Sequence, residues 1–377
     1  MGRSGKCIKM KKHIEINSMI SGYIPAENNT IIVWERLYNN LCSYDLLNNE
    51  LNVIRSFEPD EIGDFKGLNV YKKNNSIYIA GQFSLQVLIY NMADDSFMLL
   101  GSSNAVPYVT FADDNKIVFI PMSVSEKSFV FEYATGEFSE IKWNKDNLES
   151  SLISSIVCDD RYAYFSINNT NKIIKMNKLN YEYEIILCDN SDTLSGICLD
   201  NNNTIWCVSE DKYLLHITEK NIERIKLTDS TVENAFYNIA FEDNKIICIP
   251  RFSPEILIYD IVNKSTEHIE YVEENSSVTT ASFWGYVMLD EKVIILLTWG
   301  QFKSCKIDLN TFKSEFYKSF VTDKTFRKYF MSDFVMEEDG YSLDSFICRV
   351  NLNEERCITS SFGQYGKSIY LSMNNSD

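Results

Sequence analysis

The sequence is poor in the residues from which most catalytic and metal-binding motifs are built. Its 377 residues include only three histidines, 14 glycines and six prolines, and its ten cysteines are scattered. No two histidines have metal-ligand spacing, and there is no Cys-x-x-Cys pair, phosphate-binding glycine loop, nucleophile elbow or dinucleotide fingerprint. These absences argue against a structural zinc site, and we predict neither a bound metal nor a cofactor.

Positive charge is also in short supply. Lys and Arg number 36 against 53 for Asp and Glu, which gives a net charge of −17. A chain this acidic repels phosphate backbones, so we predict no nucleic-acid partner. The basic cluster at residues 9–12 is short and does not change this expectation.

Long apolar runs are missing as well. The longest, around residues 293–297, falls far short of the roughly 20 residues that a membrane-spanning helix needs. The basic residues 1–12 are followed by no apolar segment of the kind found in secretory signals. Several cysteines lie inside apolar strand patterns, which is typical of buried, reduced thiols. We therefore predict a cytoplasmic protein with no membrane partner.

The sequence does contain apolar and aromatic residues at a regular spacing. Hydrophobic residues make up 45% of it and aromatic residues 13%, enough for a large core. A short apolar strand, an Asp or Asn and a polar turn recur, most clearly at residues 89–97, 130–138 and 258–265. Seven copies centre on positions 44, 90, 131, 176, 216, 259 and 307, at intervals of 40 to 48 residues.

Another strand precedes each copy, rich in the β-branched and aromatic residues that strands favour. These segments are residues 30–34, 76–80, 116–120, 162–165, 204–208, 245–249 and 292–296. With one further strand before and one after, each repeat has the four antiparallel strands of a propeller blade. We predict an all-β, seven-bladed β-propeller over residues 13–320, with six or eight blades as alternatives. Residues 13–16 are expected to pair with the last blade and close the ring.

One stretch of the sequence carries a family resemblance. Residues 194–200 (Leu-Ser-Gly-Ile-Cys-Leu-Asp) and 203–206 (Asn-Thr-Ile-Trp) resemble the repeat of the NHL and streptogramin-lyase-like propellers of bacteria. The resemblance covers about residues 13–320 and implies the propeller fold. A streptogramin lyase would have a histidine at the channel mouth, and the loops that we assign to the mouth contain none.

The repeat pattern stops near residue 320. Apolar residues at 326, 329 and 330 have helical spacing, and residues 342–350 begin with a serine, which often caps helices. We predict a short helical appendage over residues 321–377 that packs on the propeller. It either completes the fold or docks a partner.

Paired acidic residues recur between the first and second strands of the repeats, at residues 113–114, 159–160 and 242–243. Because these pairs occupy the same turn of different repeats, we interpret them as turn formers rather than as general acids and bases.

Propeller ligands usually meet the face built by the loops between second and third strands and by the linkers between blades. Mapped on the repeats, these loops place two arginines and four aromatic residues around one channel mouth: Arg36, Tyr108, Tyr237, Arg251, Trp284 and Trp299. Aromatic rings offer contact area and arginines offer paired hydrogen bonds, which suits a peptide, protein or glycan ligand.

Two functions are compatible with such a mouth. The favoured one is a non-catalytic binding platform. The alternative is an enzyme, a lyase, cyclase or hydrolase acting on a peptide or sugar, whose active site is assembled from dispersed loops. The sequence identifies no catalytic residue and leaves the oligomeric state open.

Overall fold

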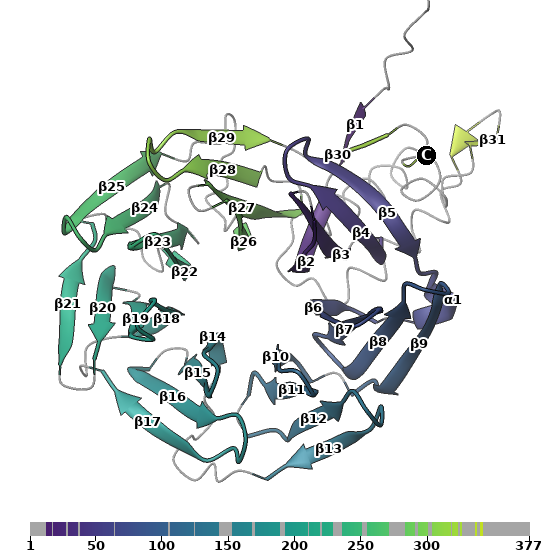
Figure 1. The fold of residues 1–377 in the computed structure, drawn as a ribbon, viewed down its shortest axis with the longest axis horizontal. Helices are drawn as coiled ribbons and strands as arrows, with labels where there is room; N and C mark the ends of the chain where they lie inside the picture. The colour runs from purple at the N-terminus through teal and green to yellow at the C-terminus, as the bar shows by residue number, and fades with distance from the viewer. Residues whose placement is uncertain are drawn as a thin grey trace, which may run out of the picture.

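The computed structural model describes residues 13–16, 18–27, 29–36, 38–63, 65–104, 106–123, 125–142, 153–167, 170–188, 193–209, 211–218, 221–228, 236–250, 255–270, 283–290, 293–300, 304–317, 319–322, 325, 336–337 and 340–341. In these ranges nearly all regular structure is β-strand. The strands form seven four-stranded antiparallel blades arranged in a ring around a central axis (Figure 1).

Each blade begins at the centre of the ring with its first strand and ends at the periphery with its fourth (Figure 1). Blade 1 consists of β2 (Ser18–Pro25), β3 (Thr30–Glu35), β4 (Asn40–Asp45) and β5 (Glu50–Ser56); blade 2 of β6 (Gly67–Lys73), β7 (Ser76–Gly81), β8 (Leu85–Asn91) and β9 (Ser96–Ser102). Blade 3 consists of β10 (Tyr108–Ala112), β11 (Lys116–Pro121), β12 (Ser128–Glu132) and β13 (Phe138–Ile141); blade 4 of β14 (Ile153–Cys158), β15 (Tyr162–Ile167), β16 (Lys172–Asn177) and β17 (Tyr183–Leu187). Blade 5 consists of β18 (Leu194–Leu199), β19 (Ile205–Ser209), β20 (Tyr213–Ile217) and β21 (Ile222–Lys226); blade 6 of β22 (Phe236–Glu242), β23 (Lys245–Pro250), β24 (Glu255–Asp260) and β25 (Ser265–Glu270). Blade 7 consists of β26 (Phe283–Asp290), β27 (Val293–Gly300), β28 (Ser304–Asp308) and β29 (Ser314–Tyr317).

The seven-bladed fold predicted from the repeats is confirmed. Each predicted strand upstream of a repeat centre is the second strand of a blade, and each repeat centre lies in a third strand. The agreement follows from burial, since the second strands are covered on both faces. β3, β7, β11, β15 and β23 each have one half-buried residue followed by five buried ones. A strand covered on both faces is a continuous apolar run, as at residues 117–120 (Ile-Val-Phe-Ile), rather than an alternating pattern.

Aspartates stabilise the turns between strands, which agrees with their interpretation as turn formers. Asp159 Oδ1 accepts hydrogen bonds from the backbone N–H groups of Arg161 (2.7 Å) and Tyr162 (2.6 Å) in a turn between first and second strands. Asp260 Oδ1 does the same for Val262 (2.9 Å) and Asn263 (2.8 Å) between a third and a fourth strand. These carboxylates satisfy backbone donors that the sheets leave unpaired, which is why Asp recurs at the blade ends.

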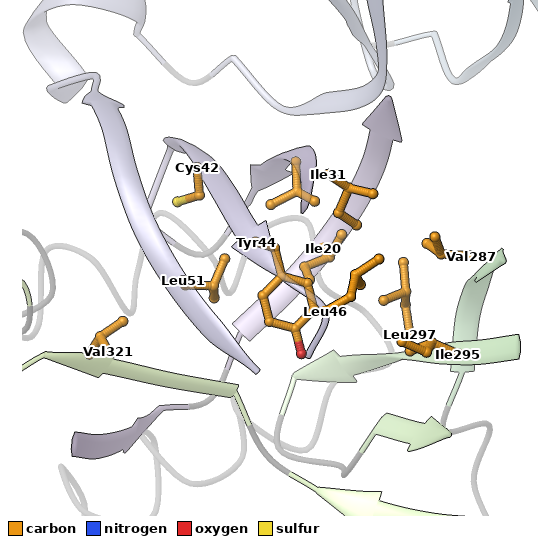
Figure 2. Close-up of a cluster of buried hydrophobic side chains, with 11 residues drawn as sticks. Ile20, Ile31, Cys42, Tyr44, Leu46, Leu51, Val287, Ile295, Leu297 and Val321 are labelled. Carbon is orange, nitrogen blue, oxygen red and sulfur yellow. The ribbon is translucent and has the colours of Figure 1, made fainter. Parts of the chain in front are cut away.

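The ring closes where blade 7 meets blade 1. There β2 pairs with β27, with Ser18 opposite Gly300 and Met19 opposite Trp299. An apolar cluster of buried side chains fills the space between these blades, and Figure 2 shows how they converge. The cluster comprises Ile20, Ile31, Val33, Cys42, Tyr44, Leu46 and Leu51 of blade 1, Val287, Ile295 and Leu297 of blade 7, and Val321.

The first strand, β1 (His13–Ile16), does not pair with the last blade, so that prediction is wrong. It runs antiparallel to β30 (Ser319–Thr322), and Phe320 of β30 pairs in parallel with Glu50 of β5. Blade 7 already has four strands of its own, so β1 and β30 extend the outer edge of blade 1 instead.

Little of the region after the propeller belongs to the described residues. β31 (Met336–Glu337) and β32 (Gly340–Tyr341) form a short antiparallel pair. The segments predicted as helices lie almost wholly outside the described residues, so the helical appendage over residues 321–377 stays a prediction. The helix α1 (Pro59–Ile62) is a single turn in the linker between blades 1 and 2. No helix in the described ranges combines the length and apolar character that crossing a bilayer demands.

We expect Gly22→Ala to destabilise the propeller, because a Cβ at position 22 would lie 2.3 Å from the carbonyl oxygen of Leu68. That oxygen belongs to the inner strand of the next blade and cannot move aside alone. The expected loss is about 3 kcal/mol, measured as the free energy of unfolding in urea. Gly63→Ala is the control, because its Cβ meets nothing within 4 Å although its φ is +59°. It should cost only about 1 kcal/mol. Equal losses for both variants would contradict the close packing of β2 on β6.

The turn aspartates should make stability depend on acid pH. Backbone N–H donation from Asn263 is the largest cause that lowers the pKa of Asp260, and the pKa of Asp94 is lowered by the Ser96 hydroxyl and backbone N–H. A lowered carboxyl pKa stabilises the fold above the unfolded-state pKa, near 4, and this contribution disappears as the pH falls through the folded-state value.

The Asp94→Asn/Asp260→Asn variant should therefore show a smaller drop in Tm between pH 7 and pH 3 than the unmodified protein. Asp160→Asn, at an exposed carboxylate with no hydrogen-bond partner in the described ranges, should leave that drop unchanged. An undiminished drop in the double variant would contradict the role assigned to these turns.

Candidate functional site

The loops that were assigned to the mouth lie together at one end of the ring's central axis, and we keep the name mouth for this end. In every blade the first strand starts at this end and the second strand returns to it, because consecutive strands are antiparallel. The turns between second and third strands and the linkers between blades therefore surround the same mouth. The turns between first and second strands, and between third and fourth strands, lie at the opposite end.

Most of the inner strands begin with the same irregularity of pairing. In six of the seven blades the register between the first two strands shifts by one residue near the mouth; the skipped residues are Ser21, Leu68, Ser154, Ser195, Tyr237 and Trp284. At such a bulge the extra residue faces no residue of the neighbouring strand in the ladder. Two of the predicted site residues, Tyr237 and Trp284, are themselves bulge residues. The residue after each bulge is Gly, Asn or Ser, which is the signal by which the sequence could have revealed the bulges.

Polar side chains just inside the mouth join neighbouring blades. Ser21 Oγ donates to the carbonyl oxygen of Gly67 at 3.0 Å, which links blades 1 and 2. Asn69 Nδ2 donates to Thr110 Oγ1 at 2.9 Å, and the Tyr71 hydroxyl lies 2.8 Å from the same Thr110 oxygen. Blades 2 and 3 are therefore joined by two side chains that share one buried hydroxyl.

The inner strands of blades 4, 5 and 6 also lie close together. Ser155 Oγ of blade 4 donates to Asn238 Oδ1 of blade 6 at 3.3 Å, past the inner strand of blade 5. Gly196 of that strand makes this possible, since a Cβ there would lie 2.6 Å from the Cα of Asn238. Blades 4, 5 and 6 thus meet at one level of the channel.

Arg36 was predicted to line the mouth, and it lies there in the turn between β3 and β4. Only 5% of the residue is exposed. Its Nη1 donates a hydrogen bond to Gln82 Oε1, and its guanidinium lies 5.5 Å from the centre of the Phe83 ring. Arg36 therefore ties the rim of blade 1 to the rim of blade 2, and a direct contact with a ligand stays a prediction.

Tyr108 begins the inner strand of blade 3 and is 1% exposed. Its hydroxyl accepts a hydrogen bond from Asn104 Nδ2 at 2.9 Å, and its ring packs edge-on against Phe119 with centroids 5.8 Å apart. Burial raises the pKa of Tyr108. Its backbone N–H donates to the carbonyl oxygen of Gln82 at 2.7 Å, so the hydrogen-bonded rim continues from blade 1 through blade 2 to blade 3.

The structure places the backbone of three further candidates. Tyr237 and Trp284 lie at the bulges of β22 and β26, and Trp299 lies opposite Met19 where β27 joins β2. Ile20, the neighbour of Met19, pairs with Glu35, so Trp299 and the Arg36 turn flank the same strand. Arg251 lies outside the described residues. As a ligand-binding set, the six residues remain a prediction.

Farther from the mouth, the inner strands carry ionisable groups that the sequence analysis did not single out. Burial raises the pKa of the Cys158 thiol to about 12 and raises the pKa of Tyr71. Burial also raises the pKa of Tyr286, with smaller contributions from Tyr23 and Cys198. These phenols and thiols are protonated at neutral pH, so none of them is an activated nucleophile or a base there.

Two of the three histidines of the sequence, His216 and His268, are engaged elsewhere. His216 stacks on Trp206 with ring centroids 4.1 Å apart, and His268 lies 3.0 Å from a carboxylate oxygen of Glu255 at the edge of blade 6. Within the described part of the chain, no group of three or more His, Cys, Asp or Glu side chains is arranged to hold a metal ion.

Comparison with known proteins identifies the fold. No protein-family model and no curated protein matches the sequence. A catalytically inactive virginiamycin B lyase from Staphylococcus aureus with quinupristin is similar in structure, with a TM-score of 0.59 and 14% identity over 76% of this chain and 96% of that one. The chain shares its propeller fold with that lyase.

Two further solved structures have the same architecture. A streptogramin B lyase has a TM-score of 0.57 and 14% identity over 76% of this chain and 94% of its own. YCF48 bound to D1 peptide has a TM-score of 0.55 and 9% identity over 77% of this chain and 92% of its own. At these identities the likeness shows the β-propeller fold alone.

The shared hydroxyl of Thr110 provides a test of the inner rim. Thr110→Val keeps the shape of the side chain but leaves Asn69 Nδ2 and the Tyr71 hydroxyl without this buried partner. We expect a loss of about 2 kcal/mol in the free energy of unfolding, read from urea titration. Thr110→Ser retains the hydroxyl and should recover more than half of the loss. Equal stability of the Val and Ser variants would show that the hydroxyl does not join the blades.

Proposed function

We propose that the protein is a non-catalytic binding platform that holds a peptide or protein partner at the mouth of its propeller channel. A glycan is the second ligand class compatible with the aromatic and arginine residues assigned to this mouth. The proposal includes the six residues predicted from the sequence, with Arg251 and Trp299 as the pair expected to contribute most to binding.

The observation that carries the proposal is the hydrogen-bonded rim of blades 1 to 3. Arg36 binds Gln82, and the backbone of Gln82 is fixed by Lys66 on one side and Tyr108 on the other, at 2.8 and 2.7 Å. A rim held in this way keeps its shape without a ligand. Binding to a preformed surface loses little conformational entropy, which favours recognition of a partner.

The alternative function is an enzyme acting on a peptide or sugar. It is supported by the fact that two proteins with the same fold are lyases. It ranks second because the buried phenols and thiol of the inner strands, Tyr71, Tyr286 and Cys158, have raised pKa values and are protonated at neutral pH. An enzyme would need its acid and base elsewhere on the mouth.

We also propose that the protein works in the cytoplasm, where a reducing environment keeps its thiols as they are in the structure. Cys42, Cys207 and Cys248 are fully buried and free. A bacterial source and NHL-type repeats belong to the same proposal.

The test is to capture partners from the native host with tagged protein, identify them by mass spectrometry and measure the affinity of the purified partner by calorimetry. The Arg251→Ala/Trp299→Ala variant should bind at least about tenfold more weakly, as expected when two anchor residues are truncated. An unchanged Kd would contradict the platform proposal.

The matched control is Leu179→Ala/Val262→Ala. These side chains are 83% and 72% exposed, and both lie in turns between third and fourth strands, at the end of the channel opposite the mouth. This variant should bind like the unmodified protein. Thermal melts of both double variants separate weaker binding from loss of the fold.

A further inference from the structure

The turn between β7 and β8 lies at the mouth and carries both an aromatic ring and a side-chain amide that are half-exposed. Gln82 and Phe83 are half-buried there, and Ser84 follows with 6% exposure. The Gln82 N–H donates to the carbonyl oxygen of Lys66 at 2.8 Å, and the Gln82 carbonyl accepts from Tyr108 at 2.7 Å. The backbone of the turn is therefore fixed to the linkers on both sides.

The side chain of Gln82 has a fixed orientation as well. Its Oε1 accepts from the Arg36 guanidinium, which is a donor only, so the Nε2 amino group must point the other way. No residue in the described ranges accepts a hydrogen bond from this Nε2, and it is not among the buried atoms that lack a partner. It is a donor held in place and reachable from solvent.

Phe83 receives its position from the same arginine. The guanidinium of Arg36 lies 5.5 Å from the ring centre, within the range of a cation–π contact. Arg36 is buried against Gln82 and Phe83. Its guanidinium therefore interacts with these rim residues and is poorly accessible to the carboxylates of an acidic partner. Ser84 adds a buried hydroxyl for which no partner is found in the described ranges.

We propose that Gln82 and Phe83 form a subsite for an extended, non-acidic peptide segment, in which Gln82 Nε2 donates to a peptide carbonyl and an apolar side chain packs on Phe83. Arg36 is the positioning residue that orients both. This proposal rests on the proposed function and narrows its ligand to peptide. The net charge of −17 also disfavours acidic peptide segments, because it repels their carboxylates.

The test uses the full chain on an array of immobilised 12-residue peptides of random sequence, with a glycan array in parallel. Peptides that bind are then measured in solution by fluorescence anisotropy. They should carry an aromatic or aliphatic residue, and replacing residues beside it with Glu should weaken binding. Phe83→Ala should weaken binding about tenfold or more.

Gln82→Glu is the sharper variant, because it keeps an oxygen for Arg36 and removes the Nε2 donor. We expect peptide affinity to fall about five- to tenfold while Tm stays the same or rises. In an Arg36→Ala background the same change should cost less affinity, because the amide is no longer oriented. That non-additivity in peptide affinity reports positioning and would not arise from a merely structural role.

The outcomes separate this proposal from the broader one. If peptides lose affinity with Arg251→Ala/Trp299→Ala but bind Phe83→Ala and Gln82→Glu normally, the subsite is wrong and the platform stands. If only glycans bind, the peptide subsite is overturned. If peptides bind all of these variants equally, both proposals fail.

Discussion

The second strand of every blade is buried on both faces, and the rest of the structure depends on that constraint. A sheet with two apolar faces has to be covered on both sides, so the series of blades can end only by returning to its start. The seam between blades 7 and 1 meets this need with the pairing of β2 to β27 and with the apolar cluster that contains Tyr44, Leu51 and Ile295. Because blades 1 and 7 each have four strands of their own, closure requires no exchange of a strand between the chain ends.

Closing seven blades into a ring brings seven inner strands close together, and this crowding shapes the mouth. Gly22 and Gly196 stand where the backbone of a neighbouring strand leaves no room for a Cβ. Ser21, Asn69 and Ser155 each form a hydrogen bond to a residue of another blade, with a short side chain that crosses the narrow gap between the inner strands. The bulges lie at the same end of the inner strands, and an extra residue there increases the local bend and twist of a strand. The mouth is therefore a consequence of ring closure.

The sequence predicted the parts of this fold that depend on local patterns. The apolar second strands and the Asp and Asn turns have their signals within a few residues, so the blade number and strand positions could be predicted. The role of β1 could not, because β30, the strand that it pairs with, is about 300 residues away and has no distinctive pattern. Arg36 lies in the turn between β3 and β4, and its burial depends on Gln82 and Phe83 of the next blade. Loop position can be predicted from a repeat, whereas contacts between loops of different blades depend on the closed ring.

Burial of Arg36 changes what the mouth is suited to recognise. An exposed arginine would attract carboxylates and phosphates, but an arginine packed under Gln82 and Phe83 uses its donors and its charge inside the protein. What the rim then presents is an uncharged amide and an aromatic ring on a turn whose backbone is held from both sides. In the proposed binding role, such a surface would distinguish partners by shape and hydrogen bonding more than by charge. The net charge of −17 would then affect which partners approach, whereas the turn that carries Gln82 and Phe83 would orient them.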